Sequence, residues 1–245
     1  MVPLSKRIAV ISDVHGNWHA LEAVLAAVAE AEPDEIWCLG DLVGYGPRPN
    51  ECCNEVAERA QICLAGNHDL VVLDHLDLDE FSPDAATSAL WTRDVLSEQA
   101  RRYLTSLPST ATVDGVGLYH ASPRDPVWEY VLSTEAALAA FALTEESLVL
   151  VGHSHVALAI LLADRLVGGL AADGVEVELG RGRWLLNPGS VGQPRDGDPR
   201  AAFLLLEQGE RATFRRVSYP IKQTQAEILE RGLPDALAER LADGV

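Results

Sequence analysis

The chain has 245 residues, of which 48% are hydrophobic, so it contains enough apolar side chains to bury a sizeable core. Its formal net charge of −18 argues against an anionic membrane surface or a nucleic-acid polymer as its main partner. The longest uncharged stretch, residues 148–163, is shorter than the ~20 apolar residues of a membrane helix. We therefore expect no membrane span.

The four cysteines show no pattern of a disulfide framework. None belongs to a C-x-x-C pair, and no secretory signal precedes the first apolar run. The simplest interpretation is buried, reduced thiols in a cytoplasmic protein, with a disulfide or metal role as the alternative. The cysteines are Cys38, Cys52, Cys53 and Cys63.

The first 65 residues alternate between strand and helix patterns. Residues 8–12, 35–39 and 61–65 are short apolar runs typical of buried strands. Asn17 is a predicted N-cap for a helix with apolar residues at helical spacing, and residues 50–60 form a second predicted helix. This alternation indicates parallel strands joined by helical crossovers.

Residues 70–107 differ, because their pattern is helical and acidic. Ser82, which precedes Pro83, and Ser97 are predicted helix starts. The segment is therefore a candidate helical cap inserted between two strand-forming regions.

Strand patterns return after residue 107. The predicted elements are strands at 110–113, 116–120 and 148–151, a helix at 134–142, several short strands within 156–206, and two closing helices within 221–242. No repeat period or low-complexity linker interrupts the chain. We therefore expect residues 1–245 to form a single domain.

Five of the seven histidines lie in short polar motifs, and a Gly-Asp pair adds a further carboxylate. The motifs are Asp13-Val14-His15, Gly40-Asp41, Gly66-Asn67-His68-Asp69, His120 and Gly152-His153-Ser154-His155. Each follows a predicted strand, and ligands gather at the carboxyl ends of strands in open α/β sheets. Since residues i and i+2 of a strand point the same way, we expect Asp13 with His15, and His153 with His155, to face a common point.

The carboxylate, amide and imidazole groups of these motifs suit two adjacent divalent cations. Mixed nitrogen and oxygen ligands favour Mn, Fe, Zn, Co or Ni over Ca, and the pattern does not choose among the five. Two cations roughly 3.5–4 Å apart can share a bridging hydroxide and stabilise an in-line displacement at phosphorus. A cationic centre in an acidic protein therefore predicts a small phosphate-ester substrate.

The order of the motifs resembles the calcineurin-like metallophosphoesterase superfamily, whose pattern is D-x-H, G-D, G-N-H-[DE], a lone H and G-H-x-H. All five blocks occur in this order between Asp13 and His155. The segment from Asn187 to Arg195 further resembles the tail motif of the small bacterial phosphodiesterase branch. The resemblance implies a four-layer α-β-β-α sandwich, in which two mixed β-sheets are flanked by helices.

The resemblance also implies a role for each motif residue. The first metal would be held by Asp13, His15 and His155, the second by Asn67, His120 and His153, and Asp41 would bridge the two. His68 would lie beside the leaving group, with Asp69 as its orienting partner. A hydrogen bond from His68 to Asp69 would favour the charged imidazole, which suits a general acid or a phosphate-binding cation.

Two departures from the protein Ser/Thr phosphatases bear on the substrate. Those enzymes carry G-D-x-x-D-R-G and R-G-N-H-E, whereas residues 40–46 and 65–69 contain neither arginine. Since these arginines grip a phosphomonoester, a phosphodiester is the preferred substrate. Tyr45, Arg195 and Arg200 are candidate substrate-binding residues, with packing or a solvated turn as the alternative for each.

The sequence thus predicts a phosphodiesterase that uses a metal-bridging hydroxide. A phosphomonoesterase and a dinucleoside polyphosphate hydrolase are alternatives on the same metals. A non-catalytic metal-binding scaffold, like the retromer subunit that resembles this family, is a third. That relative lacks a histidine equivalent to His68, so the presence of His68 here favours an enzyme.

Overall fold

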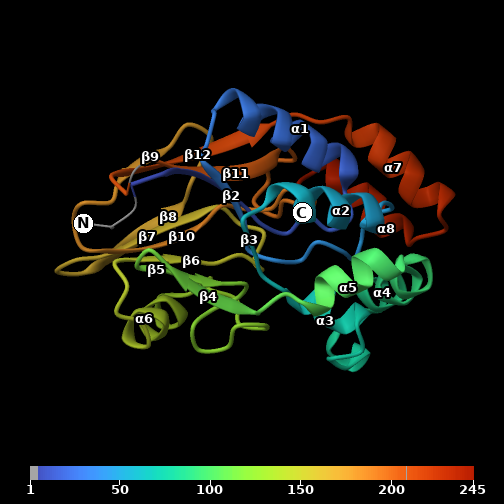
Figure 1. The fold of residues 1–245 in the computed structure, drawn as a ribbon, viewed down its shortest axis with the longest axis horizontal. Coiled ribbons are helices and arrows are strands. Elements are labelled where there is room, and N and C mark those ends of the chain that lie inside the picture. The colour runs from blue at the N-terminus through green and yellow to red at the C-terminus, as the bar shows by residue number, and fades with distance from the viewer. Residues whose placement is uncertain (1–4, 208) are drawn as a thin grey trace.

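The computed structural model describes residues 5–207 and 209–245, which form two six-stranded sheets (Figure 1). The first sheet has the strand order β3-β2-β1-β11-β12-β9. Its strands are β1 (Arg7–Ile11), β2 (Glu35–Cys38), β3 (Ile62–Cys63), β9 (Glu176–Glu178), β11 (Ala201–Glu207) and β12 (Arg211–Val217). β1, β2 and β3 are parallel, and β1 pairs with β11 in the antiparallel direction, so the sheet is mixed.

The second sheet is also mixed and has the order β4-β5-β6-β10-β7-β8. Its strands are β4 (Thr110–Val113), β5 (Val116–Tyr119), β6 (Leu148–Leu150), β7 (Leu158–Leu162), β8 (Leu166–Leu170) and β10 (Arg183–Asn187). β5, β6 and β10 run parallel, while β4, β7 and β8 pair antiparallel to their neighbours.

The two sheets pack face to face and helices cover their outer faces (Figure 1). Ile8 and Trp37 of the first sheet meet Leu118, Leu150 and Leu186 of the second in a buried apolar layer. The first sheet is covered by α1 (Trp18–Glu30) and α2 (Pro49–Arg59), and the second by α6 (Thr134–Ala142). The predicted four-layer sandwich is confirmed.

Capping side chains begin several helices where the sequence predicts them. Asn17 accepts a hydrogen bond from the backbone N–H of Ala20 at the start of α1. Ser82 and Ser97 do the same at α4 (Pro83–Val95) and α5 (Glu98–Thr105). Such caps satisfy backbone donors that have no partner within the helix.

Residues 67–105 are largely helical, and the chain also ends in helices. The remaining elements are α3 (Asn67–Val72), the 3₁₀ turn η1 (Leu78–Glu80), α7 (Ile221–Glu230), α8 (Asp235–Glu239) and the 3₁₀ turn η2 (Arg240–Ala242). In Figure 1, α7 and α8 lie at the same end of the molecule as α3 and α4.

β3 is shorter than the predicted strand at 61–65. Only Ile62 and Cys63 pair with β2 in the ladder, although the backbone N–H of Leu64 still donates to Cys38. The next N–H, that of Ala65, donates to Pro108 instead. The chain leaves the sheet early because it turns toward the loop that carries Asn67.

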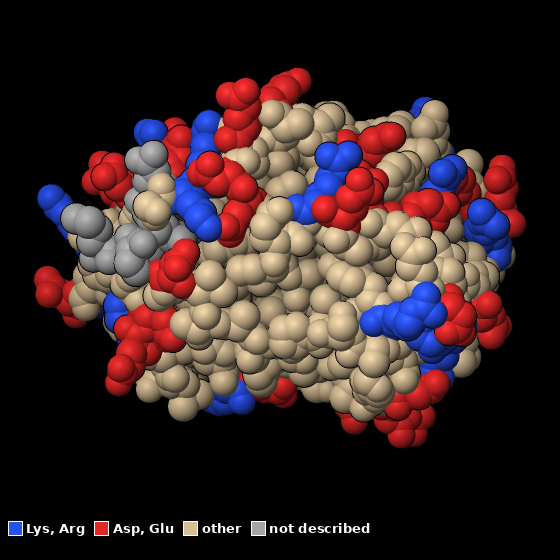
Figure 2. Space-filling model, viewed as in Figure 1, with Lys and Arg blue, Asp and Glu red and all other residues tan. Residues whose placement is uncertain are grey.

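Most charged side chains lie on the surface, where acidic and basic groups are interspersed (Figure 2), whereas Asp13, Asp41 and Asp69 are buried. In the view of Figure 2 they lie mainly around the edge, and the middle of this face is uncharged. Within the described ranges, no helix combines the length and apolarity that a membrane crossing requires. All four cysteines are buried and free, in agreement with the predicted thiols.

Candidate metal centre

The polar motifs of both sheets meet at the carboxyl ends of their parallel strands. β1, β2 and β3 are followed by Asp13, Asp41 and Asn67. In the second sheet, β5 is followed by His120, and β6 by the loop that carries His153 and His155. All of these side chains are buried. The packing of the two sheets therefore brings residues up to 142 positions apart into one cluster.

Five of the cluster residues have a left-handed backbone. They are Asp13 (φ 54°), His15 (φ 50°), Asp41 (φ 54°), His153 (φ 63°) and His155 (φ 58°). For residues other than glycine this conformation costs about 1–3 kcal/mol each and persists where the surrounding structure enforces it. Strand pleating does not align these pairs, because the residues lie past the strands and have positive φ angles. Asp13 and His15 nonetheless face one group of potential ligands, whereas His153 and His155 belong to two groups that share Asp41.

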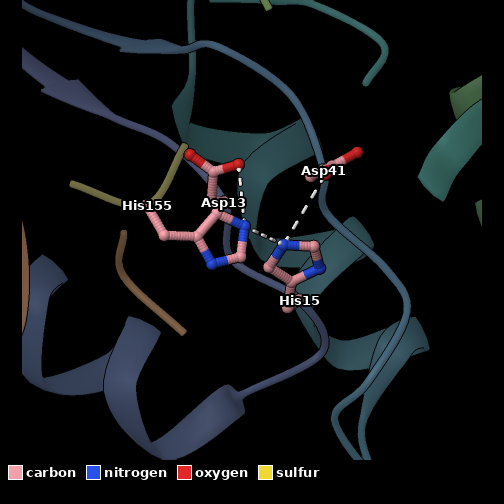
Figure 3. A group of neighbouring side chains, drawn as sticks. All are labelled: Asp13, His15, Asp41 and His155. Carbon is pink, nitrogen blue, oxygen red and sulfur yellow. Dashed lines mark hydrogen bonds and ion pairs between the residues drawn. The ribbon is translucent and has the colours of Figure 1, made fainter. Parts of the chain in front are cut away.

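One group of potential ligands combines Asp13, His15, Asp41 and His155, whose ligand atoms all lie within 4.8 Å of one another (Figure 3). The two imidazole Nε2 atoms of His15 and His155 are 3.0 Å apart. Nε2 of His155 is 3.4 Å from an Asp13 oxygen, and Nε2 of His15 is 3.6 Å from Oδ2 of Asp41. Figure 3 shows the rings turned toward one another and toward the two carboxylates.

A second group shares Asp41 with the first and adds His120 and His153. Nε2 of His120 lies 3.4 Å from Oδ2 of Asp41 and 3.2 Å from Oδ1 of Asn67. Nε2 of His153 lies 3.1 Å from the carbonyl oxygen of Trp128, so Nδ1 is the ring nitrogen that this hydrogen bond leaves available as a ligand. Asp41 therefore stands between two sets of ligands.

The hydrogen bonds of the imidazoles fit a metal. Nδ1 of His15 donates to the carbonyl of Val43, and Nδ1 of His155 donates to that of Gln193. Burial lowers the pKa of His15 to about 3 and holds that of His155 well below its usual value, so both rings are neutral. Two neutral rings that donate through Nδ1 present facing lone pairs at Nε2, and a divalent cation held by both rings would relieve this contact.

The environment of the two carboxylates also fits a bound metal. Oδ2 of Asp41 is buried without a hydrogen-bond partner, while Oδ1 accepts from the backbone N–H of His68. Burial acts to raise the pKa of Asp41, but the interaction with His120 outweighs burial and holds this pKa below its usual value. Burial raises the pKa of Asp13 to about 7. A cation would stabilise both carboxylates, which otherwise repel each other in a dry site.

Glycines let the loops that carry these residues approach closely. A Cβ at Gly66 would lie 2.1 Å from Oδ1 of Asp41, and a Cβ at Gly152 would lie 2.1 Å from Oγ of Ser12. The segment from Asn187 to Arg195, called the tail segment below, forms hydrogen bonds with the same loops. Asn187 donates to the carbonyl of Gly152, and Ser190 donates to that of Asp13.

Asp69 does not contact His68 as the sequence prediction required. Its carboxylate accepts backbone N–H groups from Leu42, Val43 and Gly66 at 2.9–3.2 Å. Within the described part of the chain, none of its hydrogen bonds reaches His68. The short α3 directs Asp69 back toward the Asp41 loop, so Asp69 positions that loop instead of the imidazole.

His68 lies in an aromatic setting beside the cluster. Its ring centroid is 4.4 Å from that of Tyr45, 4.6 Å from Phe81 and 4.8 Å from His15. Its Nδ1 is buried without a hydrogen-bond partner. Burial holds the pKa of His68 well below its usual value, a direction that favours the neutral imidazole over the charged one of the prediction.

A cleft of about 240 Å³ opens over the cluster, and two of the three predicted substrate-binding residues line it. Tyr45 and Arg195 are in the wall, and Nη2 of Arg195 is 3.3 Å from the Tyr45 hydroxyl. Arg200 is not among the lining residues and instead forms ion pairs with Asp173 and Asp198 at 2.9 and 2.7 Å. The prediction for Arg200 is therefore wrong, because its guanidinium is held by two turn carboxylates.

Several lining residues were missed from the sequence. They are Glu80, Phe81, Ser82, Ala85, Trp128, Tyr130 and Arg240. Tyr130 stacks on His153 with ring centroids 4.2 Å apart, and Phe81 meets Trp128 edge-on at 5.5 Å. None of them belongs to a motif, and the only sequence signal was the concentration of aromatic residues at 128–130 next to a polar turn.

Two mixed sheets with a buried carboxylate and imidazole cluster at their strand ends define a metal-binding α/β sandwich. The family model described as "Calcineurin-like phosphoesterase superfamily domain" matches residues 7–210 of this chain. The chain therefore belongs to the calcineurin-like phosphoesterase superfamily.

Similar proteins support this membership. The structure resembles a metallophosphoesterase from Sphaerobacter thermophilus with 44% identity and a TM-score of 0.89, covering 98% of this chain and 99% of the other. An uncharacterized protein of Methanocaldococcus jannaschii is 36% identical over 241 residues, 96% of each chain. A protein from Pyrococcus horikoshii shares the fold, with a TM-score of 0.78, 22% identity and 98% of each chain covered.

A shorter similarity involves an enzyme with a stated substrate. The symmetrical bis(5'-nucleosyl)-tetraphosphatase of Psychromonas ingrahamii is 41% identical over 68 residues, which is 26% of this chain and 24% of that one.

Proposed function

We propose that the protein is a phosphoesterase that holds two divalent metals and hydrolyses a phosphodiester, and that it acts in the cytoplasm as a single domain. The observation that carries the proposal is the sharing of Asp41 by two groups of buried ligands. Its unpartnered Oδ2 lies between Nε2 of His15 and Nε2 of His120, at 3.6 and 3.4 Å. One carboxylate oxygen so placed suits a bridge between two metals.

The ligand sets follow from the contacts. Asp13, His15 and His155 would hold one metal, and Asn67, His120 and His153 the other. Manganese, iron, zinc, cobalt and nickel all suit this mixture of imidazole nitrogen and oxygen. When bound, two such metals supply an activated water nucleophile and neutralise charge on the reacting phosphoryl group.

The residues of the chain would supply binding and orientation. The buried backbone contacts of Asp69 hold the Asp41 loop in place. His68, which lines the cleft, would hydrogen-bond to the leaving oxygen as a neutral imidazole donor. The predicted cap at 70–107 contributes four residues to the cleft wall, and we propose that this is its role. They are Glu80, Phe81, Ser82 and Ala85.

The preference for a diester rests on the two motif loops. They lack the arginines that grip a phosphomonoester dianion in the protein phosphatases, and residue 65 is an alanine. A dinucleoside polyphosphate is the second candidate substrate, favoured by the partial similarity to the tetraphosphatase of Psychromonas ingrahamii.

The test is a panel of phosphate esters with each of the five metals. The protein would be assayed on bis(p-nitrophenyl) phosphate, p-nitrophenyl phosphate, cyclic AMP and diadenosine tetraphosphate, with metal content measured by elemental analysis. His153→Gln should lose activity and bound metal, whereas His75→Gln, at an exposed histidine, should lose neither. One bound metal per chain, or hydrolysis of none of the esters, would contradict the proposal.

A further inference from the structure

Two guanidinium groups line the cleft beside the ligand cluster, and both face Tyr45. Cζ of Arg240 lies 4.9 Å from the centroid of the Tyr45 ring, and Cζ of Arg195 lies 5.8 Å from it. Arg195 comes from the tail segment and Arg240 begins the turn η2 at the end of the chain. The fold brings these two cations to one wall of the cleft.

Neither arginine has an acidic partner among residues 5–207 and 209–245. Arg195 donates to Oε1 of Gln193 at 2.8 Å and to the Tyr45 hydroxyl, both neutral acceptors. Nε of Arg240 is buried without any hydrogen-bond partner. The chain has 37 acidic and 19 basic residues, so carboxylates are abundant, and the lack of a direct ion pair at either arginine needs a reason.

Other arginines of the protein form ion pairs with aspartates. Arg200 lies 2.9 Å from Asp173, and Arg216 pairs with Asp196 although both side chains are buried. Partly buried cations are costly unless an anion compensates them. Burial, together with the charge of Arg195, lowers the pKa of Arg240.

The cleft places this pair next to the ligand cluster. Arg195, Arg240 and the cluster residues His153 and His155 all line the same cavity. Phe81 and Trp128 line it too and offer aromatic faces on which a nucleobase can stack. Guanidinium groups form charge-assisted hydrogen bonds with phosphate oxygens, so the missing anion matches a phosphoryl group of the substrate.

We propose that Arg195 and Arg240 form a second phosphoryl subsite, so that the substrate is a nucleoside polyphosphate with one phosphoryl group at the metal ligands and the next between the two arginines. The inference rests on the proposed phosphoesterase function and narrows its substrate class. Tyr45 would position them, because its ring contacts both guanidinium groups and its hydroxyl accepts a hydrogen bond from Arg195.

The test compares two substrates in matched variants. Arg240→Gln, Arg195→Gln and the exposed control Arg231→Gln would be assayed on diadenosine tetraphosphate and on bis(p-nitrophenyl) phosphate, which has a single phosphoryl group. Loss of a charged hydrogen bond should lower kcat/KM for the tetraphosphate by about tenfold more than for the single diester. Arg240→Lys, which retains the charge, should recover part of this selectivity, and Arg231→Gln should leave it unchanged.

Binding provides an independent measurement. Calorimetric titration of the metal-free protein with inorganic tripolyphosphate should show affinity that falls about tenfold in Arg240→Gln. The proposed subsite is wrong if tripolyphosphate binds the wild-type protein and Arg240→Gln equally. It is also wrong if the substitutions lower kcat/KM by the same factor for both substrates. If the wild-type protein binds tripolyphosphate through Arg240 yet hydrolyses no ester, the proposed function fails and the subsite stands. Thermal unfolding of each variant separates loss of binding from loss of fold.

Discussion

The ligand cluster and the arginine–aromatic wall share one cleft but are built in different ways. The cluster residues follow strand ends, and five of them have left-handed backbones. Two of the cluster's imidazoles donate to backbone carbonyls, those of Val43 and Gln193. The wall is assembled from η1, the loop at 128–130, the tail segment and the C-terminal turn. Under the proposed function, the cluster would serve any phosphoryl group, whereas the wall would select what the phosphoryl group is attached to.

The largest expected effect comes from the shared ligand. Asp41→Asn keeps the shape of the side chain but removes the charge that two metals would share. We expect kcat/KM to fall about a thousandfold or more on every substrate, since metal-based stabilisation contributes several kcal/mol. Elemental analysis should show reduced metal content, and Asp164→Asn at an exposed turn is the control. If the variant retained both its activity and its full metal content, Asp41 would not be a metal ligand.

The next effect separates chemistry from metal binding. His68→Asn should lower kcat by about 100-fold, since a positioned proton donor contributes at least this factor. The metal content should stay at the wild-type value, because the structure places His68 outside both ligand groups. Loss of metal in this variant would instead indicate that His68 is a metal ligand and belongs to the cluster.

Asp69→Asn tests the corrected role of Asp69. An amide in this position would place its NH₂ group against a backbone donor, such as the N–H of Gly66. We expect the free energy of unfolding to fall by about 1–3 kcal/mol, as for other unsatisfied buried groups. Chemical denaturation measures the change. Activity lost without loss of stability would favour the original assignment of Asp69 to His68.

The smallest effect is expected at Arg200. Its ion pairs with Asp173 and Asp198 are partly exposed, and pairs of this kind contribute about 0–1 kcal/mol to stability. Arg200→Gln should therefore leave kcat/KM within about twofold of wild type and change stability by less than about 1 kcal/mol. A larger loss of activity would mean that Arg200 contributes to substrate binding after all, as proposed for Arg195.

The motif residues were predictable because their chemistry is local. Short polar groups after apolar runs mark strand ends, and capping residues such as Asn17 and Ser97 mark helix starts. The direction of their side chains was not predictable in the same way. The strand periodicity assumed for Asp13 and His15 fails because both have positive φ angles, which only the surrounding turns impose.

By itself, the sequence determined the strand and helix order, the residues of the cluster and the class of ligand they suit. The tertiary structure alone decided that Asp69 contacts the Asp41 loop, that Arg200 is held by carboxylates, and that Arg240 reaches the cleft. The physical reason is the range of the interactions. Strand-end turns depend on neighbouring residues, whereas the pairing of Tyr45 with Arg195, 150 positions apart, depends on how whole layers pack.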